Sequence, residues 1–169
     1  MRRTVSAVGS ESRSAFFYRA TCEHGGVTSV WINGTLYPPE TASVGAFDHG
    51  LTAGDGAFES MELIEGIPFA PTRHLRRLAR STEALGLRIP YDDQVLRDAL
   101  AEVGSEVQDR GVLRLTLTGG NGPLGSGRSD VTPSVIIAAT GGHAPWGNFA
   151  DVHVVPWVRN ERGAMSGVK

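Results

Sequence analysis

The sequence predicts an α+β domain. Three observations lead to this class: a hairpin turn at Asn33-Gly34, two adjacent stretches of helical periodicity between residues 72 and 108, and strand-like runs at 111–118 and 134–140. Hairpins on either side of a helical pair are typical of an α+β domain and do not fit a regular βαβ alternation. The chain has 169 residues, 40% of them hydrophobic, which is enough for one domain and the start of another.

The composition excludes several classes of partner. A net charge of -2, without a lysine-rich block, gives no electrostatic reason to expect nucleic acid or a membrane surface. The single cysteine, Cys22, cannot form an internal disulfide, and the five histidines are too dispersed for a metal site. No apolar run approaches the roughly 20 residues of a membrane helix. We therefore expect a soluble, cytoplasmic protein without a metal.

Residues 1–29 differ in composition from the rest of the chain. Arg2, Arg3, Arg13 and Arg19 are interleaved with serines, and no hydrophobic period holds. There is no apolar segment long enough for a secretory signal. We expect a flexible extension; the Arg/Ser bias leaves a transit peptide as the alternative.

From residue 30 the pattern becomes that of short strands. Asn33-Gly34 can supply the two positive-φ residues of a type I′ turn, so a β-hairpin should form around it. Residues 43–47 alternate as a strand does, and the glycines of 48–56 indicate a tightly folded loop.

The run at 57–64 predicts a strand that Glu65-Gly66 turns back into residues 67–70. Alternation divides its side chains between two faces. The first face carries Phe58, Ser60 and Glu62, and the second carries Glu59, Met61 and Leu63. A carboxylate on each face is unusual for a strand that only builds a core.

Two helices are predicted next. Thr72 is the expected cap of the first, which stops at Gly86. Asp92 or Asp93 begins the second, which runs through Gln108. The 3.6-residue period places one stripe of each helix in the core. These core positions are Leu75, Leu78, Thr82 and Leu85 in the first helix and Leu96, Ala99, Leu100 and Val103 in the second.

Strands are then predicted at 111–118, 134–140 and 151–158, the first with leucines alternating against polar residues. Between the second and third strands lies a segment whose glycines and proline suit a linker. The predicted organisation is an extension at 1–29, an N-terminal domain at 30–140, a linker at 141–150 and the start of an incomplete C-terminal domain at 151–169.

Residues 120–125 match G-x-G-x-x-G, a pattern found in dinucleotide sites. Such a site needs a helix directly after the glycines, and here the chain leads into another strand. A loop lining a pocket and a plain surface loop are the two interpretations that remain. The sequence has no G-x-S-x-G elbow for a serine nucleophile.

Lys169 is the only lysine in the chain. A primary amine can form an imine with a carbonyl, and neighbouring cations such as Arg159 and Arg162 can lower its pKa toward neutrality. By itself, a lysine at this position could equally be a solvated charge.

Five segments carry a resemblance: WINGTLY, SVGAFDHGLTAGDGAFES, PFAPTRHLRRLARSTEALGL, RLTLTGGNGPLGSG and PWVRNERGAMSGVK. In this order and spacing, residues 30–169 resemble the class IV aminotransferase family (fold type IV pyridoxal-phosphate enzymes). This family includes branched-chain and D-amino-acid aminotransferases and 4-amino-4-deoxychorismate lyase. H-x-x-R-L at 74–78 and G-D-G-x-F-E at 54–59 are the strongest matches. The resemblance implies the N-terminal two-layer α/β domain of the D-amino-acid aminotransferase-like fold.

The resemblance also implies roles for individual residues. Lys169 matches the lysine that binds pyridoxal 5'-phosphate covalently and later shuttles a proton. Arg77 matches the arginine that binds the cofactor phosphate, a role suited to a guanidinium fork. Phe58 matches an aromatic residue of the substrate pocket, and Glu59 its acidic neighbour. Amino acid and 2-oxo acid substrates and a homodimer follow from the family.

One departure bears on the substrate. Some relatives have an arginine in the Gly-rich loop that could bind a substrate carboxylate, and Leu124 stands there in this chain, with Arg128 out of register. The change favours amino transfer from a smaller or more apolar donor. 4-Amino-4-deoxychorismate lyase, a non-catalytic binding domain and a small structural module are the alternatives.

The family's C-terminal domain is longer than 151–169. It holds the carboxylate that pairs with the pyridine nitrogen and a second phosphate-binding loop. We therefore expect the 169-residue chain alone to be inactive.

Overall fold

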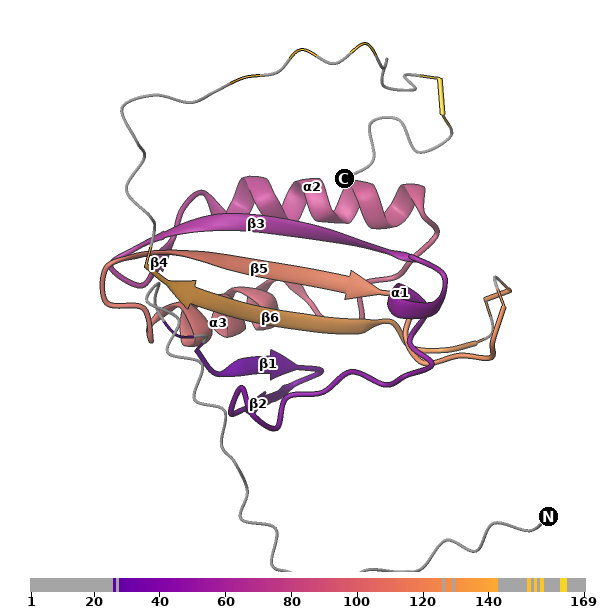
Figure 1. Cartoon of the computed structure of the whole chain (residues 1–169), viewed down its shortest axis with the longest axis horizontal. Coiled ribbons are helices and arrows are strands. Elements are labelled where there is room, and N and C mark those ends of the chain that lie inside the picture. Colours follow the sequence, from indigo (N-terminus) through magenta and orange to yellow (C-terminus); the bar gives the residue numbers. More distant parts are fainter. Residues whose placement is uncertain are drawn as a thin grey trace, which may run out of the picture.

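The computed structural model describes residues 28–125, 127–128 and 130–142, with Gly26 and five single positions between 152 and 163. Over these residues the strands form one antiparallel sheet in the order β2-β1-β6-β5-β3-β4 (Figure 1). The strands are β1 Val30–Ile32, β2 Thr35–Tyr37, β3 Gly56–Ile64, β4 Ile67–Pro68, β5 Arg110–Thr118 and β6 Ser134–Gly141. The helices are α1 His49–Thr52, α2 Pro71–Ala84 and α3 Asp93–Gly104.

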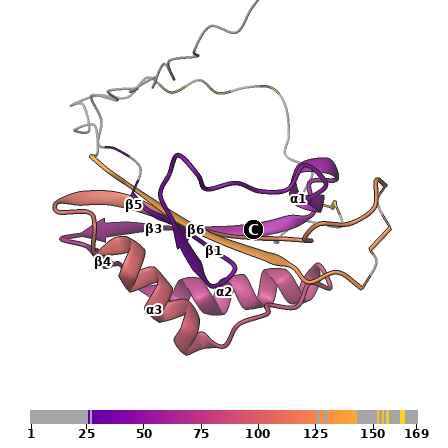
Figure 2. The ribbon, with the colours of Figure 1, turned by 90° about the horizontal axis from the view of Figure 1, so that it is seen from below.

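The two long helices, α2 and α3, cover one face of the sheet, which we call the helix face (Figure 2). The short helix α1 and the segment leading to it lie on the other side, which we call the open face. This arrangement confirms the predicted two-layer α+β domain.

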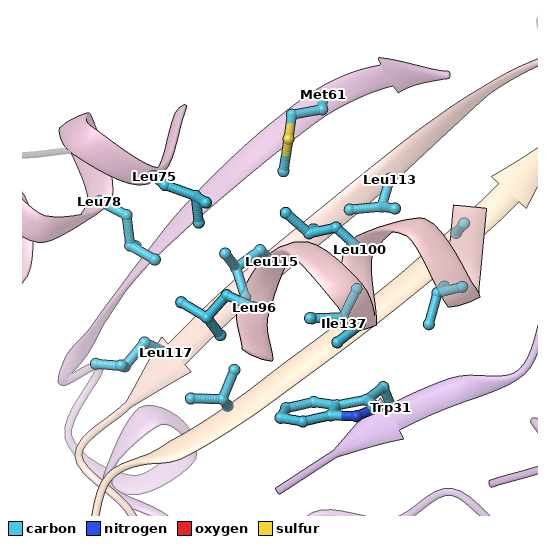
Figure 3. Packing of buried hydrophobic residues seen from close by; sticks show 14 of the residues in the cluster. Trp31, Met61, Leu75, Leu78, Leu96, Leu100, Leu113, Leu115, Leu117 and Ile137 are labelled. Carbon is cyan, nitrogen blue, oxygen red and sulfur yellow. The ribbon is translucent and has the colours of Figure 1, made fainter. Parts of the chain in front are cut away.

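The core lies between the helices and the helix face of the sheet (Figure 3). Leu113, Leu115 and Leu117 of β5 are fully buried there, as the alternation in the sequence predicted. Leu100 of α3 packs toward them, and Trp31 of β1 meets Tyr91 edge-on at 5.1 Å between ring centroids. Burial of this apolar surface is the main term that stabilises the layers.

The predicted hairpin is confirmed. Asn33 and Gly34 adopt φ values of 49° and 93°, and the strands on either side of them pair in register from Val30 to Tyr37. Glu65 and Gly66, with φ of 50° and 79°, turn β3 back into β4 in the same way. Both turns have the positive φ pair that matches the right-handed twist of a hairpin.

The helix boundaries needed correction. Thr72 does not cap α2, which begins at Pro71 after Ala70 in the left-handed region, without a side-chain cap. Proline fits this first position because its missing N–H has no partner in a helix anyway. α3 starts as predicted, with the Asp92 carboxylate accepting from the Val95 N–H, but ends at Gly104 rather than Gln108.

Two strand expectations were also wrong. Residues 43–47 alternate in sequence but form no strand, because no neighbouring strand pairs with them and all five are exposed. The strand after Gly66 covers only Ile67–Pro68 instead of 67–70. Residues 48–56, expected as a loop, contain α1, whose N-cap Asp48 accepts from the Gly50 N–H at 2.7 Å.

Several predicted segments lie largely or wholly outside the described residues: most of the extension 1–29, the linker from 143 onward and the strand 151–158. Where the extension is described, Thr28 already donates its N–H to the Ala139 carbonyl of β6 at 3.0 Å. None of the helices in the described part of the chain has the length and apolar character to cross a membrane.

Candidate functional site

A buried carboxylate joins β3 to α2. Glu59 points to the helix face and is fully buried. Its Oε1 accepts from Arg77 Nε at 2.6 Å, and its Oε2 accepts from Arg77 Nη2. His74 Nδ1 lies 2.8 Å from the same Oε2. His74 and Arg77, one helical turn apart on α2, therefore converge on one acid, which we call the Glu59 cluster.

The charge state of the Glu59 cluster follows from its contacts. Burial works to raise the pKa of Glu59, but the hydrogen bonds and charges of Arg77 and His74 outweigh it and hold that pKa below its ordinary value. An ionised carboxylate only accepts hydrogen bonds, so His74 Nδ1 must be the donor in its contact with Oε2. The Glu59 carboxylate in turn raises the pKa of the Arg77 guanidinium.

The open face carries a different pair. Phe58, next to Glu59 in sequence, points the opposite way and is 39% exposed. The Cζ atom of Arg114, on β5, lies 4.5 Å from the centroid of the Phe58 ring, and its Nε donates to Ser60 Oγ at 3.2 Å. A cation over an aromatic ring in this geometry is favourable, and Arg114 is exposed.

Beside this pair is a hollow of about 290 Å³. Phe58, Thr116 and the glycines at 50, 54 and 56 contribute to its lining, so α1 and the G-D-G segment form one of its walls. A Cβ at Gly50 would lie 2.6 Å from Thr118 Cγ2, and one at Gly56 would lie 2.5 Å from the Leu117 carbonyl oxygen, so this wall is tightly packed.

The Gly-rich loop after β5 is fixed against α1. Thr118 Oγ1 donates to the buried Asp48 carboxylate at 2.8 Å, and His49 Nε2 lies 3.0 Å from the Pro123 carbonyl oxygen. Gly122 is required at its position because a Cβ there would lie 2.7 Å from the His49 ring nitrogen. The loop is thus a packed wall of the open face that presents Leu124, 75% exposed.

Arg128 lies farther along the same connection and has a structural contact. Its Nε and Nη2 donate to the two oxygens of Asp55, at 2.7 and 2.6 Å, and its Nη1 donates to the Leu85 carbonyl. This bidentate pair joins the G-D-G segment to the end of α2. Each of the three guanidinium nitrogens of Arg128 therefore donates a hydrogen bond within the protein.

The structure separates the residues that the sequence grouped as one pocket. Phe58 and Leu124 lie on or beside the open face, whereas Glu59 is buried on the helix face with Arg77. Lys169 lies outside the described residues. Arg114 was missed as a candidate, although the alternation of β5 and its pairing with Ser60 of β3 would have placed it beside Phe58. Among the described residues there is no group of acids, histidines or cysteines placed to hold a metal.

Comparison with known proteins identifies the family. The profile of the family described as amino-transferase class IV matches residues 56–169, which is more than half of the chain. The chain belongs to the class IV aminotransferase family. The resemblance seen in the sequence motifs is thereby confirmed.

Individual relatives are similar to this chain in sequence or in fold. A putative branched-chain-amino-acid aminotransferase of Methanocaldococcus jannaschii is 34% identical over 98 residues, covering 57% of this chain and 34% of the relative. The crystal structure of a branched-chain aminotransferase from Thermoproteus uzoniensis, with norvaline, is 26% identical with a TM-score of 0.62, covering 69% and 41% of the two chains.

A 4-amino-4-deoxychorismate lyase structure from Pseudomonas aeruginosa is also similar, at 33% identity and a TM-score of 0.54, over 64% of this chain and 38% of that one. The chain therefore matches little more than a third of the length of these three proteins.

Proposed function

We propose that this chain is part of an enzyme that transfers an amino group from an amino acid to a 2-oxo acid with pyridoxal 5'-phosphate. The observation that supports this proposal best is the Glu59 cluster. It lies in a domain of the class IV family and holds the Arg77 guanidinium with one edge directed outward. That edge suits the phosphate of the cofactor, because a guanidinium binds phosphate oxygens through paired N–H groups. The cofactor, when bound, serves as the electron sink for the reaction.

We assign phosphate binding, covalent attachment of the cofactor and substrate contact to different residues of this chain. Arg77 holds the phosphate from the side of α2. Lys169 is the residue we propose for covalent attachment of the cofactor and for proton transfer, since it is the only lysine. Phe58 and Leu124 border the substrate.

Arg114 is our candidate for binding a substrate carboxylate. It stands over Phe58 on the open face, beside the hollow, and supplies the positive charge that Leu124 does not. The names of the relatives, branched-chain and D-alanine aminotransferases, support amino transfer. A soluble cytoplasmic homodimer, as the family implies, is part of the same proposal.

A donor panel tests the reaction. The protein, expressed with any residues that follow Lys169 in its gene, is given L- and D-amino acids with 2-oxoglutarate or pyruvate, and separately 4-amino-4-deoxychorismate. We expect a keto acid from at least one small or apolar donor. Rapid formation of p-aminobenzoate with no keto acid from any donor would establish the lyase reaction instead.

Two variants and one label test the residues. Arg77→Ala should weaken cofactor binding about tenfold or more, as expected for a charged hydrogen bond to phosphate, while Arg76→Ala, on the exposed side of α2, should have little effect. Borohydride reduction of the holoprotein followed by peptide mapping should label Lys169. A label on the N-terminal amine, or equal cofactor affinities for the two arginine variants, would reject these assignments.

A further inference from the structure

Glu59 has no route to a substrate on the open face. Its neighbour Phe58 points there, whereas Glu59 is fully buried on the helix face of the same strand. Among the described residues, the hydrogen-bond partners of its two carboxylate oxygens are Arg77 and His74 of α2. Any effect of Glu59 on the reaction must therefore pass through one of those two side chains.

The hydrogen bonds to Glu59 fix the orientation of the Arg77 guanidinium. A guanidinium has five N–H groups, one on Nε and two on each Nη. Glu59 takes the Nε–H and one N–H of Nη2. What remains is the opposite edge, made of Nη1 and the second N–H of Nη2. The described residues provide no hydrogen-bond partner for Nη1, and the side chain is 39% exposed.

His74 completes this arrangement from the preceding turn of α2. Its Nδ1 donates to the same oxygen that accepts from Arg77 Nη2, and the two nitrogens lie 3.3 Å apart. The carboxylate is thus held from two directions and cannot rotate away from Arg77 without losing the His74 bond. An arginine that is already oriented loses less conformational freedom when it binds an anion.

A second ion pair on β3 shows what the Glu59 cluster adds. Glu62, on the open face, also accepts from two nitrogens of an arginine, Arg110, but both side chains are exposed, at 36% and 66%. An exposed pair of this kind gains little because water and salt screen it. A fully buried carboxylate must instead be compensated by well-placed donors, and here those donors are on the helix that carries Arg77.

We propose that Glu59 and His74 are positioning residues that give this protein its selectivity for a phosphorylated ligand over the same ligand without phosphate, by holding the outward edge of Arg77. The inference rests on the proposed function, in which Arg77 binds the cofactor phosphate. It reassigns Glu59 from a pocket residue to a residue that acts through Arg77.

The test compares pyridoxamine 5'-phosphate with pyridoxamine. The two ligands differ only in the phosphate, and neither forms an imine with a lysine. The ratio of the affinity for pyridoxamine 5'-phosphate to the affinity for pyridoxamine therefore measures only how strongly the protein binds the phosphate. Dissociation constants are measured by calorimetry on the cofactor-free full chain. In Glu59→Gln we expect the affinity for pyridoxamine 5'-phosphate to fall about tenfold, the loss of a charge-assisted contact, with the affinity for pyridoxamine unchanged within about twofold.

Three further variants separate positioning from general damage. Glu62→Gln, on the same strand, should leave the ratio unchanged. His74→Gln should lower the ratio about threefold, since it weakens only one of the bonds to Glu59. If Glu59→Gln does not fold, the result for His74→Gln tests the positioning role in its place. In an Arg77→Ala background, Glu59→Gln should cause no further loss, because its effect passes through Arg77.

The outcomes distinguish this inference from the proposed function. If Arg77→Ala leaves the ratio unchanged, the phosphate role of Arg77 fails, and the positioning role fails with it. If Arg77→Ala abolishes the preference but Glu59→Gln and His74→Gln keep it, the proposed function stands and only the positioning role is overturned. Equal losses for both ligands in Glu59→Gln would also overturn it, since they would indicate a general structural defect.

Discussion

The two faces of the sheet use the same strands for different purposes. On the helix face, β3 and β5 contribute Met61, Leu63 and the three leucines of β5, all buried, with Glu59 as the one acid among the buried residues of these strands. On the open face the same strands carry Phe58, Ser60 and Arg114, exposed or half-buried and close to the hollow. Within β3 and β5, the helix face therefore carries stability and the open face presents exposed side chains, whereas Arg77 offers its exposed edge from α2.

The largest difference between the faces should appear in β5. Leu115→Ala removes a fully buried side chain and should cost about 2–5 kcal/mol of unfolding free energy. Thr116→Ala, its neighbour on the open face, should change stability by no more than about 0.5 kcal/mol. Urea denaturation of both variants measures the contrast; similar losses would mean that the open face is covered in the protein.

A smaller difference is expected between the two acids of β3. Glu59→Gln replaces a buried carboxylate that accepts from Arg77 and His74, and should cost about 1.5–3 kcal/mol. Glu62→Gln affects the exposed pair with Arg110 and should cost less than about 1 kcal/mol. The same urea titrations at neutral pH give both values. If Glu62→Gln lost more unfolding free energy than Glu59→Gln, the open face rather than the helix face would contribute the more stabilising acid of β3.

The pH dependence of the unfolding free energy should also differ between the wild-type protein and Glu59→Gln. Because the pKa of Glu59 in the folded protein is below its ordinary value of 4.5, the stability it contributes is present above that value. It is lost as the pH falls through the lowered pKa of the folded state. As the pH falls below about 4.5, wild-type unfolding free energy should therefore fall more steeply than that of Glu59→Gln. Parallel curves for the two proteins would show that Glu59 does not titrate as its contacts require.

A small effect on stability is expected for Arg114. Arg114→Ala removes an exposed side chain and a cation–π contact, so unfolding free energy should change by only about 0.5–1 kcal/mol. If Arg114 binds a substrate carboxylate, the same variant should raise the KM for acidic or 2-oxo acid substrates about tenfold. Arg110→Ala, at the start of β5, is the matched control. An unchanged KM would remove Arg114 from the substrate site while leaving the description of the faces intact.

Local sequence determined the parts of this protein whose physics is local. Asn33, Gly34 and Gly66 favour tight hairpins because asparagine and glycine adopt positive φ more readily than other residues. The leucines of β5 specify a buried face because side chains alternate along a strand. The motifs around Gly54 and His74 were sufficient to indicate the family. The alternation also showed that Phe58 and Glu59 point to opposite faces of β3.

Only the tertiary structure decided what those residues meet. The alternating run 43–47 forms no strand because no partner strand lies beside it, and Thr72 does not cap α2 because Pro71 begins the helix earlier. The pairing of β3 with β5 brings Arg114 over Phe58, and the packing of α2 on β3 brings Arg77 and His74 onto Glu59. These contacts join residues 15 to 56 positions apart, and which side chains meet at such distances depends on how helices and strands pack, which no local pattern contains.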